Sequence, residues 1–324
     1  MYHYVRNLKS SRYPEIKGLD VELFKEQLRY ILKYYKVIKM EELIDAVKNK
    51  SKLADNSLLL TFDDGYQDHY EFVFPILNEL GLQGSFFPPA KAILNNQVLD
   101  VNKIHFILAC VTDHGSVIRD IFSLMDQHRE EFSLDSNVSY ETRLKTAESR
   151  YDPKEVIFIK RMLQKELPEK LRNIIVNYLF NKHVSKDERS FARTLYMSMD
   201  QLKEMKSKGM FIGSHGYAHY WLNTLPQEEQ EQEVDLSLNF LNNIGCDTKD
   251  FVFCYPYGMY NETTLSVLKA KGCALALTTQ VGIADLSQDP LTLNRLDTND
   301  LPKDSEAVAN KWTLEISSEK SFKQ

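Results

Sequence analysis

Cysteine is scarce in this sequence, and the cysteines present form no CxxC motif. They lie among largely apolar residues, a pattern typical of a protein in a reducing compartment; the four are Cys110, Cys246, Cys254 and Cys273. The chain has no apolar run of the ~20 residues that a bilayer crossing requires. Its first ten residues contain no apolar stretch of the signal-peptide kind. These absences argue against a secreted disulfide scaffold and a membrane span. They predict a cytoplasmic protein, in the cytosol or at the inner membrane face.

Runs of basic residues, low-complexity tracts, internal repeats and Pro/Gly/Ser-rich linkers are also missing. The chain has 40 Lys and Arg against 46 Asp and Glu, a net charge of −6, which argues against a nucleic-acid-binding surface. A composition of 43% hydrophobic and 27% charged residues is that of an ordinary folded globule. With 324 residues, the chain is long enough for two domains or for one large α/β barrel with an insertion.

What the sequence does contain is an alternation of short apolar runs with amphipathic segments. The expected strands are residues 36–39, 57–62, 84–88, 210–214, 251–255, 273–279 and 291–296. The expected helices are one behind an N-cap at Asp20, residues 41–48, one ending near Gly81, one between a capping box at Ser198 and Gly209, and residues 227–243 and 262–271. Such an alternation indicates a parallel sheet, and about seven strands favour a closed or nearly closed barrel.

Residues 98–196 break this alternation and are expected to be helical. They contain one glycine, Gly115, and a helix start at Asp152 with proline in the next position. A helical stripe follows, made of Leu171, Ile174, Ile175, Tyr178 and Leu179. We therefore expect a barrel of residues 1–97 and 197–324 that carries a helical insertion of residues 98–196. The insertion could cap an active site, or it could pack laterally or form a dimer surface.

Two adjacent carboxylates end the most apolar expected strand, in the segment TFDDG at residues 61–65. A strand followed by an Asp-Gly turn is common and needs no function. However, neighbouring carboxylates raise each other's pKa, and a cation between them would offset that repulsion. Side chains of Asp63 and Asp64 would point to opposite faces of a regular strand. They could converge on one ion only where the strand breaks, and Gly65 permits such a break.

Two histidines follow another expected strand, in the segment SHGYAH at residues 214–219. Because His215 and His219 are four residues apart, we expect them on one face of a helical turn, where they could share a metal ion. Such pairs are often ordinary surface or core histidines. Asp64 also falls at the carboxyl end of a strand, the face where barrel enzymes place their sites. Two histidines and one carboxylate with an open position describe a catalytic metal site.

A third segment, Tyr255-Pro256-Tyr257-Gly258, again follows an expected strand. It could be a plain Pro-Gly-type turn. It could also present a backbone N–H group to a developing oxyanion.

In this order and within a β/α alternation, TFDDG, SHxxxH and YPYG resemble the motifs of the polysaccharide deacetylase family (NodB-homology domain, carbohydrate esterase family 4). The resemblance covers about residues 1–90 and 196–301 and leaves out the helical segment. It implies a distorted (β/α)7-type barrel and metal-dependent removal of an acetyl group from a sugar amide.

The resemblance also implies roles for individual residues. Asp64, His215 and His219 would bind a divalent metal, of which Zn²⁺ is the expected one. Asp63 would be the general base, and the backbone N–H of Tyr257 would help to hold the oxyanion.

Two positions depart from the family pattern. Many members have an arginine where this chain has Cys254, and many supply the general acid from a later histidine, but no histidine follows His219 here. The chain is closer to the branch similar to poly-N-acetylglucosamine deacetylases, in which an N-terminal Tyr-His supplies the acid. His3 matches that histidine, or it is an ordinary strand residue. Arg295 could replace the missing arginine as the partner of Asp63, or it could form a structural ion pair.

The leading expectation is therefore a metal-dependent hydrolase that removes the acetyl group from an N-acetylated sugar in a surface-glycan or polysaccharide pathway. The expected partner is an acetylated sugar or glycan precursor, with no nucleic acid and no membrane span. One alternative is a sugar O-acetyl esterase or a deformylase. Another is a non-catalytic carbohydrate-binding or scaffold protein on the same barrel.

Overall fold

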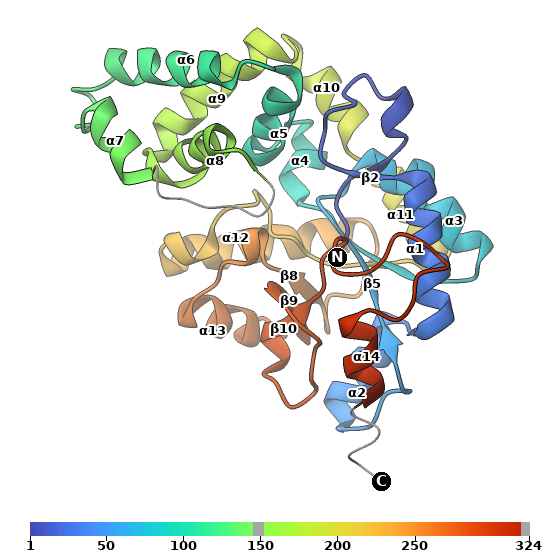
Figure 1. The fold of residues 1–324 in the computed structure, drawn as a ribbon. Coiled ribbons are helices and arrows are strands. Elements are labelled where there is room, and N and C mark those ends of the chain that lie inside the picture. The colour runs from blue at the N-terminus through green and yellow to red at the C-terminus, as the bar shows by residue number, and fades with distance from the viewer. Residues whose placement is uncertain (145–151, 319–324) are drawn as a thin grey trace. The chain divides into compact units, whose positions relative to one another are not determined.

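The computed structural model describes residues 1–144 and 152–318, in which the chain forms two compact units. The first unit contains Met1–Asn7, Gly18–Gln97 and the chain from Ala192 onward. The second unit contains Leu8–Lys17 and Val98–Phe191. Every strand of the described residues belongs to the first unit (Figure 1).

Two three-stranded parallel sheets form the centre of the first unit. One contains, in order, β5 (Leu60–Asp63), β6 (Gly84–Phe87) and β7 (Phe211–Ile212). The other contains, in order, β8 (Val252–Cys254), β9 (Leu275–Val281) and β10 (Leu293–Arg295). Smaller parallel pairs join β1 (Val5–Arg6) to β2 (Leu19–Asp20) and β3 (Lys36–Val37) to β4 (Ser57–Leu58).

Single contacts connect these sheets into a ring. A parallel bridge between Ser214 and Phe253 joins β7 to β8, and a bridge between Tyr2 and Phe62 places the N-terminal segment beside β5. The amino group of Met1 donates a hydrogen bond of 2.8 Å to the carbonyl of Leu296, just after β10. The strand order thus returns to its starting segment. The fold is the distorted (β/α)7-type barrel that the sequence predicts.

The α-helices of the first unit are α1 (Val21–Tyr34), α2 (Met40–Asn49), α3 (Phe74–Glu79), α4 (Ala90–Asn95), α11 (Met199–Ser207), α12 (Gln227–Asn243), α13 (Glu262–Ala270) and α14 (Lys311–Ser318). Most of these α-helices lie where the sequence pattern predicts them, whereas α4 and α14 were not predicted. Asp20 caps α1 by accepting a hydrogen bond from the N–H of Glu22, and Ser198 and Gln201 form the expected capping box on α11. These local signals correctly predict where the helices begin.

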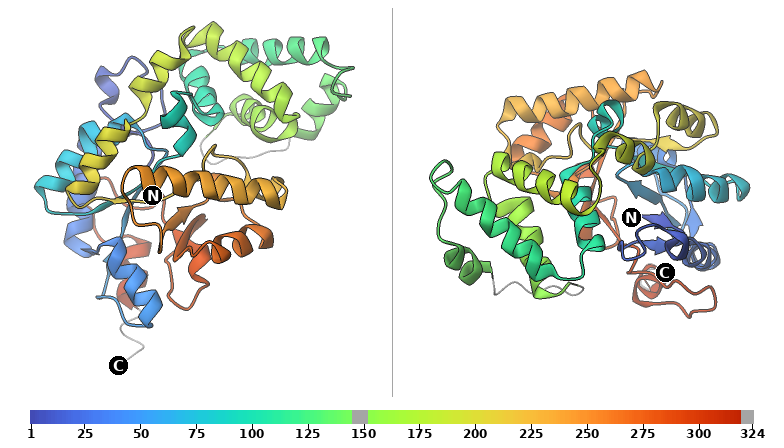
Figure 2. Two further views of the ribbon diagram at one scale, coloured as in Figure 1. Left: turned by 180° about the vertical axis from the view of Figure 1, so that it is seen from behind. Right: turned by 90° about the horizontal axis from the view of Figure 1, so that it is seen from above.

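Both faces of the central strands are buried. On β8, Val252 and Cys254 pack into an apolar cluster with residues of α2 and β10. Their neighbours Phe251, Phe253 and Tyr255 pack into a second cluster with residues of α12 and α13. Figures 1 and 2 show these two helices beside strands β8 to β10. The alternation follows the two-residue period of a strand and explains its continuous apolar sequence.

The second unit is helical throughout its described residues. Its helices are α5 (Asp100–Cys110), α6 (His114–Gln127), α7 (Asn137–Leu144), α8 (Lys154–Arg161), a π-helical turn (Met162–Glu166), α9 (Glu169–His183) and the first half of α10 (Glu188–Leu195). Residues 8–17 join this unit, in which the ring of Tyr13 packs edge-on against Phe106 with centroids 4.9 Å apart. The sequence pattern had placed residues 8–17 with the barrel.

Two local expectations in this unit are wrong. Helix α8 begins at Lys154 with Pro153 as its N-cap, one residue later than expected, and Asp152 forms ion pairs with Lys17 and Lys160. On α9, Ile174 and Tyr178 of the expected apolar stripe are 39% and 44% exposed. The buried face of α9 is shifted and consists of Leu171, Ile175, Val176, Leu179 and Phe180.

No helix within residues 1–144 and 152–318 is both long enough and apolar enough to cross a membrane. The four cysteines are free, and one of them, Cys110, is exposed, although the sequence pattern placed it in apolar surroundings.

Candidate metal centre and active site

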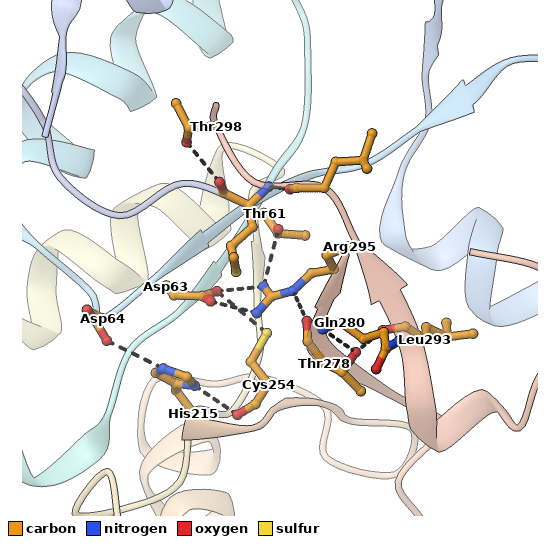
Figure 3. Close-up of polar contacts among 12 residues, drawn as sticks. Thr61, Asp63, Asp64, His215, Cys254, Thr278, Gln280, Leu293, Arg295 and Thr298 are labelled. Carbon is orange, nitrogen blue, oxygen red and sulfur yellow. Dashed lines mark hydrogen bonds and ion pairs between the residues drawn. The ribbon is translucent and has the colours of Figure 1, made fainter. Parts of the chain in front are cut away.

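The first site segment begins where β5 ends. Asp63 is the last residue of the strand, and the chain then turns through two left-handed residues, Asp64 with φ 70° and Gly65 with φ 66°. A side chain at Gly65 would bring its Cβ to 2.6 Å from the Cβ of Pro88. The strand therefore breaks where the sequence suggested, and the two carboxylates take separate surroundings (Figure 3).

Asp64, His215 and His219 come together in a buried cluster. One ligand atom of each lies within 4.8 Å of the other two. The Oδ1 atom of Asp64 lies 3.4 Å from Nε2 of His215 and 3.5 Å from Nε2 of His219. The two imidazole rings are 4.8 Å apart, edge to face. The structure thus brings together all three residues that the sequence proposed as metal ligands.

In both Asp64 and His215, one polar atom is hydrogen-bonded to the protein and the other faces this cluster. The Nδ1–H of His215 donates to the carbonyl of Cys254 at 2.8 Å, which leaves its Nε2 lone pair available. The hydroxyl of Tyr66 donates to Oδ2 of Asp64, whereas Oδ1 is buried and accepts no hydrogen bond from the described residues. A buried, unsatisfied carboxylate oxygen facing two imidazole nitrogens fits a divalent cation such as Zn²⁺.

Residues 215–219 do not form the expected helical turn. They make an irregular loop after β7, and His219 has a left-handed φ of 61°. The buried carboxylate of Glu233, on α12, accepts hydrogen bonds from the N–H groups of Tyr217 and Ala218 at 3.1 and 2.8 Å. The N–H of Lys91, on α4, donates to the carbonyl of Tyr217 at 2.8 Å. Contacts with two other elements therefore bring the histidines together, and helical spacing does not.

Burial and neighbouring charges together shift the pKa values of these groups. Burial and the charge of His215 lower the pKa of His219 to about 3, which favours the unprotonated imidazole that a metal requires. Burial lowers the pKa of His215, but the close contact with Asp64 and the charges of Asp63 and Asp64 raise it by more, so the net shift is upward. Burial of Asp64 is outweighed by its contacts with the histidines, so its pKa is lowered. The cluster favours a positive charge at its centre.

Asp63 is held by Arg295 and Cys254 (Figure 3). The guanidinium of Arg295 donates two hydrogen bonds, from Nη1 to Oδ1 at 3.0 Å and from Nη2 to Oδ2 at 2.8 Å. The thiol of Cys254 lies 3.5 Å from Oδ1 as a weaker donor. Burial raises the pKa of Asp63, but the charge and hydrogen bonds of Arg295, together with the charges of His215 and His3, outweigh burial, so the net pKa is lowered. The carboxylate is therefore ionised and fixed in orientation, as a general base needs.

The third site segment is the turn Pro256–Gly258, which follows β8. Tyr257 in this turn is left-handed, with φ 57° and ψ 6°. Its ring packs edge-on against His219 at 4.7 Å and stacks on Trp221 at 4.6 Å. At Gly258, with φ 70°, an added Cβ would fall 1.9 Å from Oγ1 of Thr279. The structure thus places the turn beside the metal-binding loop.

His3 lies in the N-terminal segment near the same end of the barrel. Its carbonyl accepts a hydrogen bond from Nε2 of His69 at 2.7 Å. The charge of the His3 imidazole contributes to lowering the pKa of both Asp63 and Asp64. His69 is fully buried against aromatic rings, and the structure places it outside the cluster of possible ligands.

The sequence pattern missed four residues that shape this site: Tyr66, Trp221, Glu233 and Cys254. Tyr66 directly follows the DDG turn, so its position in the sequence is a signal for it. The sequence marks Cys254 only as the residue at a position where many family members have an arginine, and gives no role for its thiol. Glu233 looks like any acidic residue on an amphipathic helix, so nothing in the sequence marks it.

Known proteins resemble this chain in sequence and in fold. A family model for polysaccharide deacetylase matches residues 50–122 and 174–276. The putative polysaccharide deacetylase YxkH of Bacillus subtilis (strain 168) is 33% identical over 109 residues, which cover 33% of this chain and 38% of that protein. The chain thus matches well under half of the length of this relative.

Two solved structures share the fold. The Streptococcus pyogenes deacetylase PplD, in complex with acetate, superposes with a TM-score of 0.55 at 18% identity over 91% of this chain and 89% of its own. IcaB from Ammonifex degensii superposes with a TM-score of 0.54 at 18% identity over 98% and 94%.

The family model covers more than half of the chain, including β5 with its paired aspartates and the loop with the two histidines. The chain belongs to the polysaccharide deacetylase family.

Proposed function

We propose that this protein is a divalent-metal-dependent hydrolase that removes the acetyl group from an N-acetylated sugar in a surface-glycan or polysaccharide pathway. The observation that supports this most is the buried trio of Asp64, His215 and His219, with its unsatisfied Oδ1, beside an ionised Asp63. Catalytic zinc sites have three such protein ligands and keep a fourth position open. Its membership of a deacetylase family supports acetyl removal as the reaction.

In this proposal Asp63 is the general base. A Zn²⁺ ion held by the trio would lower the pKa of bound water toward ~7 and polarise the acetyl carbonyl. Asp63 would accept the proton of that water on the carboxylate that Arg295 holds in place. General-base assistance of this kind contributes about 10²–10⁴ in rate.

The remaining roles belong to a backbone group and an imidazole. The N–H of Tyr257, in the left-handed turn beside His219, would donate to the developing oxyanion. His3, when protonated, would donate a proton to the leaving amine as the C–N bond breaks. The products would be acetate and a free amino sugar. All these residues lie in the barrel segments 1–97 and 197–324, and the helical insertion 98–196 contributes none of them.

Acetate release tests this proposal. The purified protein is incubated with N-acetylated nucleotide sugars, lipid-linked sugars and oligosaccharides, with and without a chelator, and then with added Zn²⁺. We expect acetate from at least one class, loss of that activity with the chelator and recovery with Zn²⁺. Release that a chelator does not affect, with no metal in the protein, would contradict metal dependence.

The absence of a histidine after His219 favours a second candidate, a sugar O-acetyl esterase. An ester has a better leaving group than an amide, so its cleavage depends less on a general acid. Replacement His3→Ala separates the two. We expect amide turnover to fall in this variant, and unchanged amide turnover would remove His3 as the acid. Preference of the wild-type protein for esters, kept in His3→Ala, would support the esterase.

A deformylase would be distinguished by release of formate from N-formylated sugars in the same assay. A non-catalytic scaffold on the same barrel would release neither acetate nor formate. Metal analysis adds a second readout, because a scaffold has no need to hold one stoichiometric divalent ion.

A further inference from the structure

The two carboxylate oxygens of Asp64 have different surroundings. Oδ1 faces the Nε2 atoms of His215 and His219 at 3.4 and 3.5 Å and accepts no hydrogen bond from the described residues. Oδ2 accepts a short hydrogen bond of 2.5 Å from the hydroxyl of Tyr66. One oxygen is thus directed to the metal cluster, and the other is already bound to the protein.

Local backbone geometry brings Tyr66 to Asp64. Asp64 and Gly65 are both left-handed, so the chain reverses direction directly after β5. This reversal lets the side chain of Tyr66 reach back to the residue two positions earlier. In a continuous strand, the side chains of residues 64 and 66 would point in the same direction from the same face, and the Tyr66 hydroxyl would not turn back to Asp64.

The ring of Tyr66 is held by contacts with other aromatic rings. It has no exposed surface, and it stacks on Tyr4 with centroids 4.0 Å apart and on Tyr196 at 6.2 Å. The guanidinium of Arg6 lies 5.0 Å from the centroid of the Tyr4 ring, which extends the stack by one charged group. A ring packed in this way has few alternative rotamers, so its hydroxyl stays on Oδ2.

We propose that Tyr66 is a positioning residue that keeps Asp64 a one-oxygen metal ligand. An aspartate that bound through both oxygens would occupy a further coordination position. Because the Tyr66 hydroxyl occupies Oδ2, that position stays available for water and for the acetyl oxygen of the substrate. This inference rests on one part of the proposed function, the metal site of Asp64, His215 and His219. It does not depend on which reaction that site catalyses.

Metal binding by Tyr66→Phe is the test, because phenylalanine keeps the stacked ring and removes only the hydroxyl. Zn²⁺ affinity is measured in competition with a chromophoric chelator. We expect it to fall about 10–100-fold, the usual effect of losing a hydrogen bond to a metal ligand. The visible absorption spectrum of the Co²⁺-loaded protein is the second readout. We expect it to weaken in the variant, because Oδ2 then joins the coordination and raises the coordination number.

Tyr30→Phe is the matched control. Tyr30 is also fully buried, and its hydroxyl is hydrogen-bonded to Oγ1 of Thr313 at 2.8 Å, in contact with α14 rather than with the metal cluster. Both variants lose one buried, hydrogen-bonded phenol group, so a general loss of stability would affect both. We expect Tyr30→Phe to keep the wild-type Zn²⁺ affinity and Co²⁺ spectrum.

A double-mutant cycle with Asp64→Asn checks that Tyr66 acts through Asp64. If it does, adding Tyr66→Phe to Asp64→Asn lowers Zn²⁺ affinity by much less than it does in the wild type. An unchanged affinity and spectrum in Tyr66→Phe, or an equal loss in Tyr30→Phe, would overturn the assignment. Wild-type protein that binds no stoichiometric ion would overturn it together with the metal site. Protein that binds Zn²⁺ but releases no acetate would contradict the proposed function and leave the role of Tyr66 standing.

Discussion

Asp63 is a buried carboxylate held by two neighbouring side chains. Its carboxylate is 2% exposed and receives two hydrogen bonds from Arg295 and a third contact from Cys254. Removing one partner of a buried ion pair typically costs about 3–5 kcal/mol, because the other charge stays buried without compensation. The pair that would orient the carboxylate in the proposed mechanism therefore cannot lose one partner without destabilising the barrel.

Asp63→Asn should bind one metal ion as the wild type does and lose at least ~100-fold in turnover, because the amide cannot accept the proton of water. Its melting temperature should also fall, since Arg295 loses its counter-charge. Metal content, acetate release and thermal unfolding measure the three effects.

Asp68→Asn is the control for the loss of a buried aspartate–arginine pair. Asp68 is 8% exposed and accepts a hydrogen bond of 2.7 Å from Nε of Arg6. This variant should lose stability without a comparable loss of turnover. Full activity of Asp63→Asn would end the assignment of the base.

Helix α12 packs against the sheet and also contacts the loop that carries His215 and His219. Its residue Glu233 accepts hydrogen bonds from two consecutive N–H groups of the loop that carries the histidines. Burial raises the pKa of Glu233, while these two bonds lower it. The helix therefore holds the loop in the left-handed conformation that His219 adopts.

Glu233→Ala should weaken Zn²⁺ binding, because the loop is no longer held. It should also destabilise the protein, since each buried N–H left unsatisfied costs about 1–3 kcal/mol. Zn²⁺ titration and urea unfolding measure the two effects. Glu229→Ala, on the same helix at an exposed position, should change neither. Equal Zn²⁺ affinity in Glu233→Ala and wild type would show that the loop keeps its conformation without Glu233.

The turn Pro256–Gly258 can be tested through its glycine, since a backbone N–H cannot be replaced directly. Gly258→Ala would place a methyl group against Thr279 and impose a left-handed alanine, so Tyr257 and its N–H should shift. We expect kcat to fall at least ~100-fold, the usual cost of losing an oxyanion donor, with Zn²⁺ affinity unchanged.

Gly209→Ala separates the backbone effect from the effect on the turn. Gly209 also has a positive φ, of 89°, but an added Cβ there meets no atom within 4 Å. It should lose a little stability and keep kcat. A wild-type kcat in Gly258→Ala would remove the turn from the mechanism.

At the scale of the whole molecule, buried His69 should make the stability of the fold depend on pH. Its Nε2 hydrogen-bonds the carbonyl of His3, and its buried Nδ1 has no hydrogen-bond partner among the described residues. Burial lowers its pKa from 6.5 to about 4. Between these two values the unfolded chain binds the proton more tightly, so stability increases with pH there.

Acidification from pH 7 to pH 4 should therefore cost the wild type up to roughly 3 kcal/mol through His69 alone. His69→Gln should show a smaller difference between urea unfolding at pH 7 and at pH 4.5. His128→Gln, which removes a histidine from the surface of the second unit, should keep the wild-type difference. An identical pH dependence of wild type and His69→Gln would contradict this account.

Sequence predicted the barrel because its signals are local. Unbroken apolar runs, the Asp20 cap and the Ser198 capping box depend on residues close together in the chain, and each lies where expected. Prediction was weaker in the second unit, where the exposed Ile174 and Tyr178 belong to an apolar stripe that the packing of α9 does not follow. Periodicity alone does not tell which side of such a helix meets its neighbours.

The candidate site shows the same division. Asp63, Asp64, His215 and His219 could be named from the sequence, because short motifs at strand ends carry them and the ends of parallel strands meet on one face of a barrel. Tertiary structure alone decided that Arg295 holds Asp63, that Glu233 holds the histidine loop, and that Trp221 stacks on Tyr257. The hydrogen-bonded residues are 15 residues apart in one case and 232 in another, and the histidine loop is irregular. Neither contact follows the regular spacing of a helix or strand, so a sequence pattern does not predict it. The sequence shows which chemical group each side chain carries. The orientation of that group depends on the distant residues that the fold brings into contact with it.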